Sequence, residues 1–302
     1  MSGATESLGR KIAGAEDLKA VVRSMKALAA SSIGQYERAI ESLNDYYRTV
    51  ELGLSACLRQ VGSVPDAVDK APASKHAVGA VIFGSDQGLV GRFNEVLMEF
   101  AMGKLAALTG KTKRVWAVGE RMHALVADAG RAAPGILPVP SSVEAITALV
   151  GRILVDIGAA RERDDIVEIH VFHNHPISAA LYEPVGTRLL PLDRLWRDRL
   201  AAQSWPTRNL PEVIDGAMPA LDAFIREYLF VLLFQACAES LASENASRLA
   251  AMQRAEKNIG EILDELKRTF HRVRQESIDE ELFEVIAGYE SLSHDRHRSR
   301  RL

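Results

Sequence analysis

The loop from Gly84 to Gly91, Gly-Ser-Asp-Gln-Gly-Leu-Val-Gly, stands where many proteins bind phosphate groups. It follows an apolar run and precedes a helical pattern, and glycines at such a junction let backbone amides approach a phosphate. However, its glycines are four and three residues apart, which is not the G-x-G-x-x-G spacing, and no Gly-Lys-Ser/Thr follows as in a P-loop. We therefore predict a structural turn that packs on the next helix, and no bound nucleotide or other cofactor.

Histidines 170, 173 and 175 form a second feature, because clustered imidazoles are common metal ligands. They lie in a run that reads as a β-strand, in which successive side chains point to opposite faces. His170 should therefore point away from His173 and His175, and we predict no metal site. Elsewhere no nucleophile and base occur together in a motif, so no catalytic residue is predicted.

The third feature is the basic, polar segment from Ser293 to Leu302. Short basic ends are usually solvated, and contact with anionic lipid or another subunit is the alternative.

Composition limits the classes of protein to consider. With 302 residues, 47% of them apolar and 25% charged, the chain can bury a substantial core. A net charge of −3 gives no general attraction to nucleic acid. The two cysteines, Cys57 and Cys237, suit a reducing compartment, and the first 20 residues lack the apolar core of a signal peptide. These observations predict a cytoplasmic protein without a nucleic-acid partner.

Long helical patterns at both ends must position these features. Near the N-terminus, apolar residues follow alternating steps of three and four, which is typical of a coiled coil. They are Ile33, Tyr36, Ile40, Leu43, Tyr47, Val50, Leu54, Cys57 and Val61. A second stripe consists of Ile259, Leu263, Leu266, Phe270, Val273, Ile278, Leu282, Val285 and Tyr289. The nearly apolar run 228–238 is too short to cross a bilayer and predicts a buried helix.

The middle of the chain reads as an α/β domain. Strands are expected at 77–83, 114–118, 166–172 and 188–192, with helices at 92–108 and 142–159, and the first two strands should be parallel. Proline-containing linkers are expected at 62–76 and 205–219. The predicted domains are an N-terminal helix (1–64), a central α/β domain (65–210), a C-terminal helix (211–290) and a basic tail (291–302).

Five stretches match motifs of one known family in the correct order. They are Arg23–Ser31, Ser85–Gly91 with Asn94, Leu189–Leu192, Glu239–Glu244 with Arg248 and Ala251–Met252, and Arg274–Gln275 with Ile278–Gly288. Through them, residues 1 to about 290 resemble the gamma subunit of the rotary F-type ATP synthase. The chain departs from the family pattern at Asp279, Tyr289, Val90, Arg92 and Ser32, so it resembles a divergent branch. A sodium-pumping bacterial complex is one candidate, but the sequence does not identify the ion.

The resemblance implies an antiparallel coiled coil of the terminal helices and a central Rossmann-like domain. It implies a non-catalytic rotor that couples ion flow to ATP synthesis or hydrolysis at the cytoplasmic face of the bacterial inner membrane. The implied partners are the hexamer of alpha and beta subunits, the epsilon subunit and the c-subunit ring, and membrane contact is indirect. The implied subunit contacts are Arg23, Met25, Lys26, Arg274 and Gln275.

Two other functions are compatible with the sequence. One is a nucleotide-binding α/β enzyme that uses the Gly84–Gly91 loop, and the other is a free-standing coiled-coil scaffold. Nucleotide binding by the isolated chain would favour the first. Identical behaviour with and without alpha and beta subunits would favour the second.

Overall fold

The computed structural model describes residues 2–61, 77–108, 113–131, 135–164, 166–178, 181–209, 211–214 and 216–298. The chain divides into two compact units. The smaller unit contains residues 1–27 and 252–302, and the larger contains residues 28–251. The four domains predicted from the sequence are defined by sequence pattern, whereas these two units are defined by contacts. The four-domain division therefore stays a prediction.

A four-stranded mixed sheet forms the centre of the larger unit, with strand order β2-β1-β3-β4. Strand β1 (Ala77–Phe83) pairs in parallel with β2 (Lys113–Val118) and with β3 (Ile166–Ser178). Strand β4 (Leu181–Leu190) pairs antiparallel with β3 at the edge of the sheet. The predicted parallel pair of the first two strands is therefore confirmed.

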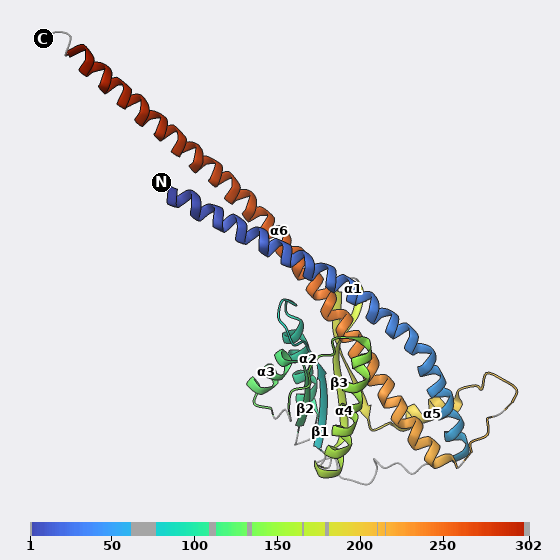
Figure 1. The fold of residues 1–302 in the computed structure, drawn as a ribbon. Helices are drawn as coiled ribbons and strands as arrows, with labels where there is room; N and C mark the ends of the chain where they lie inside the picture. Colours follow the sequence, from blue (N-terminus) through green and yellow to red (C-terminus); the bar gives the residue numbers. More distant parts are fainter. Residues whose placement is uncertain are drawn as a thin grey trace. The chain divides into compact units, whose positions relative to one another are not determined.

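Every residue of β1 is buried. Since successive side chains of a strand point to opposite faces, both faces of the sheet are covered, and helices provide the cover. Val78, Ala80 and Ile82 pack in one core with α2 (Phe93–Ala107) and α3 (Glu120–Asp128). Ala77, Val81 and Phe83 pack in a second core with α4 (Val143–Asp164) and the long terminal helices. Figure 1 shows α2 and α3 on one side of the sheet and α4 on the other.

The terminal helices are α1 (Ser2–Val61) and α6 (Ala217–Arg298). Within the larger unit, the predicted stripe on α1 faces inward: Tyr36, Val50, Leu54 and Cys57 are buried, and its other members are half-buried. The run 228–238 on α6 belongs to the same core, as its apolar composition predicted. No helix among the described residues is long and apolar enough to span a membrane.

The smaller unit is built from the first turns of α1 and the C-terminal half of α6. Ile259 and Leu263 of the second predicted stripe are buried there, and Leu266, Phe270 and Val273 are half-buried. The end of the stripe differs from the prediction. Ile278, Leu282, Val285 and Tyr289 are 55–75% exposed, since nothing in the described part of this unit covers them.

Several boundaries need correction. The predicted strands 166–172 and 188–192 are parts of a longer antiparallel pair, in which Pro191 and Leu192 take no part. Neither α3 nor α5 (Arg194–Ala202) is predicted from the sequence, because each has only nine residues. Helix α6 begins at Ala217 and is helical to Arg298, while the first linker, 62–76, lies outside the described residues.

Candidate functional site

The turn after β1 is held by internal hydrogen bonds. The Oδ1 atom of Asn94 accepts from the Ser85 backbone N–H at 2.9 Å, and its Nδ2 donates to Ser85 Oγ at 2.8 Å. The Ser85 hydroxyl donates in turn to the carbonyl of Gln87 at 2.9 Å. The amide of Gly84 donates to Val118 O on the neighbouring strand at 2.9 Å. These polar groups all have hydrogen-bond partners within the protein, as expected for a structural turn.

Asp86 joins this turn to the start of α3. Its carboxylate accepts from the backbone N–H of Glu120 at 3.0 Å and from that of Val139 at 3.1 Å. A carboxylate at a helix N-terminus satisfies a free N–H and interacts well with the helix dipole. The motif residues Asp86 and Asn94 therefore organise the carboxyl edge of the sheet.

Three serines of α6 join the helix to that same edge. Ser240 donates to Phe83 O at 3.0 Å, Ser243 to Asn174 O at 2.9 Å, and Ser247 to Val90 O at 2.6 Å. Their spacing of three and four residues places the hydroxyls on one face of the helix. All three are buried, and they donate to the carbonyls of Phe83 at the end of β1, of Asn174 within β3 and of Val90 in the turn after β1.

The next residue on this face, Glu244, is a buried carboxyl paired with Arg248 at 2.5 Å. Burial raises the pKa of the Glu244 carboxyl, and the guanidinium of Arg248 opposes that rise. The motif Glu-Ser-Leu-Ala-Ser-Glu is thus the junction between helix and sheet. The sequence revealed it only by family resemblance, because the carbonyls that it binds lie 69 and 157 residues away in the chain.

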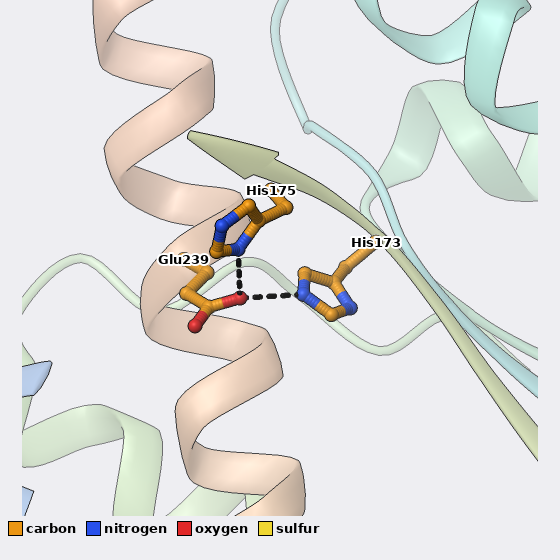
Figure 2. Close-up of side chains that lie close together, drawn as sticks. All are labelled: His173, His175 and Glu239. Atoms are coloured by element: carbon orange, nitrogen blue, oxygen red, sulfur yellow. Dashed lines mark hydrogen bonds and ion pairs between the residues drawn. The ribbon is translucent and has the colours of Figure 1, made fainter. Parts of the chain in front are cut away.

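Two of the three clustered histidines meet a carboxylate from α6 (Figure 2). Glu239 Oε2 lies 2.7 Å from His173 Nε2 and 2.8 Å from His175 Nδ1. His170 lies on the other face of β3, where it bonds Glu168 at 2.8 Å and stacks on Phe172, so the predicted opposite orientation is confirmed. Burial disfavours the charged form of Glu239, but hydrogen bonds from His173, His175 and Gln235 outweigh it and hold its pKa at about 2.

The N-terminal contact residues predicted by resemblance lie in the smaller unit. Arg23 Nε and Lys26 Nζ bind the two carboxylate oxygens of Glu256 at 2.8 and 2.5 Å. The side chain of Arg23 is nevertheless 62% exposed. Met25 is half-buried. The two cations therefore have an internal partner, which the sequence did not predict.

The C-terminal contact residues, Arg274 and Gln275, are both exposed. Arg274 lines a shallow groove of about 730 Å³ between the first turns of α1 and residues 270–281 of α6. The structure does not bring these two residues together with Arg23, Met25 and Lys26 into one site. They occupy separate surfaces of the smaller unit.

An α/β sheet domain between two long terminal helices that pack on each other is the architecture of the central-stalk subunits of rotary ATPases. Residues 4–292 match the protein family described as ATP synthase. The chain belongs to this family, as a non-catalytic gamma subunit of the central stalk of an F-type ATP synthase.

Relatives of similar length support this assignment. The ATP synthase gamma chain of Syntrophus aciditrophicus (strain SB) is 29% identical over 306 residues, covering 96% of this chain and 99% of that one. The gamma chain of Kineococcus radiotolerans is 26% identical and covers 99% of this chain and 100% of that one. Their names do not identify the coupling ion.

Solved structures show the same fold. A chain of the Tetrahymena thermophila mitochondrial ATP synthase central stalk and c-ring aligns with a TM-score of 0.55 and 19% identity, covering 78% of this chain and 99% of that one. A chain of the Euglena gracilis mitochondrial ATP synthase aligns with a TM-score of 0.63 and 16% identity, covering 97% and 95%.

Proposed function

We propose that the chain turns inside a hexamer of alpha and beta subunits and transmits the rotation of a c-subunit ring to them. An asymmetric shaft touches each catalytic subunit differently, and differential contact shifts each subunit toward a different conformation. The same rotation couples ion flow to ATP synthesis, or ATP hydrolysis to pumping. The epsilon subunit is a further partner of the sheet domain, and the complex holds the chain at the cytoplasmic face of the membrane.

The observation that best supports this proposal is the uncovered end of the α6 stripe. Leu282 is 56% exposed, Phe283 70%, Val285 69% and Tyr289 75%. Contiguous exposed apolar surface usually marks a site of protein interaction. A collar of alpha and beta subunits around this end would bury these side chains.

Charged and polar groups next to this stripe fit the same partner. We propose that Arg274 and Gln275 hydrogen-bond a loop of a catalytic subunit, because a guanidinium forms strong bidentate contacts with carboxylates. Arg23, Met25 and Lys26 contribute a second contact. Arg23 keeps much of its surface exposed while it binds Glu256, so it can bind a second acceptor.

Assembly with purified alpha and beta subunits tests the proposal. The double variant Leu282→Asp, Val285→Asp should fold normally, since both side chains are exposed, but should fail to co-purify with the hexamer. Glu280→Ala, an exposed polar change on the same helix, is the matched control and should assemble. Normal assembly of the double variant would show that this stripe is not the interface.

A further inference from the structure

The rotor function does not account for the way in which His173, His175 and Glu239 come together. The two histidines are two residues apart on β3, so both point to the face on which α6 packs. Glu239 comes from α6 and meets both rings (Figure 2). One ligand atom from each residue lies within 4.8 Å of the other two. Two imidazole nitrogens and one carboxylate oxygen therefore converge on one point.

The surroundings of this cluster resemble those of metal ligands. Gln235 Nε2 donates to Glu239 Oε1 at 2.8 Å, which fixes the carboxylate and leaves Oε2 for the histidines. Carboxylates and imidazoles that bind metals are usually oriented by such outer hydrogen bonds. The side chain of His173 is only 8% exposed. Its Nδ1 atom, on the other side of the ring from Nε2, is buried without a hydrogen-bond partner in the described part of the chain, and a bound water is a common partner for such an atom.

The cluster also has access to solution. A cavity of about 390 Å³ lies beside it, and its lining includes Thr187 and Val185 of β4. The side chain of His175 is 44% exposed, in contrast to the buried His173. An ion can therefore enter from the cavity, and a water molecule there can serve as a further ligand.

We propose that His173, His175 and Glu239 form a binding site for a divalent transition metal, with Zn²⁺ as the best fit. Zinc prefers nitrogen and carboxylate ligands at about 2.0–2.2 Å in a tetrahedron, which places ligand atoms about 3.4 Å apart. The present separations of 2.7 and 2.8 Å require only small side-chain rotations to reach that spacing. The fourth position faces the cavity.

A metal here bridges β3 and α6 within the larger unit. It would reinforce the junction that Ser240 and Ser243 already make, because a ligand that binds only the folded chain stabilises it. This role is independent of the rotor function. It needs no contact with another subunit.

The test uses the full chain without a histidine tag, titrated with Zn²⁺ against a chromophoric chelator and with Co²⁺ by visible absorption. His175→Ala and Glu239→Gln each remove one ligand. His170→Gln is the matched control, because this histidine lies on the opposite face of the same strand. Gln235→Ala removes only the outer hydrogen bond and should weaken affinity by about 10–100-fold.

We expect one Zn²⁺ per wild-type chain, the spectrum of four-coordinate Co²⁺, and a higher unfolding temperature with Zn²⁺. All three should be lost in His175→Ala and Glu239→Gln and kept in His170→Gln. Far-UV circular dichroism identifies any variant that fails to fold, and His175→Ala is the safer of the two because the ring is partly exposed. Equal Zn²⁺ binding by wild type and His175→Ala, or no Zn²⁺ binding by wild type, would overturn the proposal. The cluster would then be only a hydrogen-bonded link between β3 and α6.

Discussion

The ammonium of Lys26 on α1 lies 2.5 Å from the carboxylate of Glu256 on α6, and Arg23 binds the other oxygen of the same carboxylate. The two cations are one helical turn apart, so a single carboxylate receives both. Hydrogen bonds from Lys26 and then Arg23 hold the pKa of Glu256 at about 2, below its ordinary value of 4.5. This cluster ties the two helices of the smaller unit together.

The pairing of the helices in the smaller unit should therefore depend on pH. Because the pKa of Glu256 is lower in the folded state, its stabilisation is complete above about pH 4.5 and is lost as the pH falls from 4.5 through 2. Hydrogen exchange of residues 2–27 and 252–287 as a function of pH measures it. Glu256→Gln should exchange faster than wild type at pH 6, and the difference should shrink toward pH 2.

Glu261→Gln is the control, since its carboxylate is exposed and lies 3.9 Å from Lys257. Such a surface ion pair contributes little to the stability of the fold. If Glu261→Gln and Glu256→Gln had the same effect at every pH, the shared carboxylate would not hold the helices.

The serines of α6 should contribute measurably to stability. Ser243→Ala leaves the carbonyl of Asn174 buried without its donor, which should cost about 1–3 kcal/mol. Ser42→Ala removes a hydroxyl that only bonds its own exposed helix at Arg38 O, and should cost less than about 0.5 kcal/mol. Urea unfolding of both variants gives the comparison. Equal free energies of unfolding would argue against the proposed role of the junction.

The contrast between these serines and the apolar stripes shows what the sequence could predict. The stripe from Ile33 to Val61 was predicted correctly because helical spacing is local, and its members are buried or half-buried as expected. The binding of Ser247 to Val90 joins positions 157 residues apart, and no local pattern encodes it. Strand β4 was largely missed because its first eight residues are exposed or half-exposed and include Pro184 and Gly186.

The candidate metal cluster was missed for the same reason. The spacing of His173 and His175 placed both on one face of a strand, but Glu239 lies 64 residues further along the chain. The separation of His170 from the other two could be predicted, because strand alternation is local. The third ligand could not.

Gly119 should be intolerant of substitution. A Cβ atom there would lie 2.6 Å from the backbone of Ser85, and its φ of +98° is strained for any other residue. Gly119→Ala should therefore lower the free energy of unfolding by at least about 2 kcal/mol. Gly130→Ala is the matched control, because its φ is +68° but no atom of the described residues lies within 4 Å of the added Cβ. It should cost about 1–2 kcal/mol. A larger loss for Gly130→Ala would contradict the close packing of α3 on the turn.

Substitution of Arg274 and Gln275 distinguishes a contact that transmits torque from a solvated surface. Arg274→Ala with Gln275→Ala should leave folding nearly unchanged, because both side chains are exposed in the smaller unit. In the complex with alpha and beta subunits, loss of one charge-assisted hydrogen bond would remove about 1.5–3 kcal/mol. If that bond forms in only some rotational states, ATPase turnover should fall more than tenfold, since 1.4 kcal/mol changes a rate tenfold.

Deletion of Ser293–Leu302, beyond the matched motif, is the comparison and should change turnover little. Wild-type turnover in the double variant, with unchanged thermal melting, would place the working contact elsewhere.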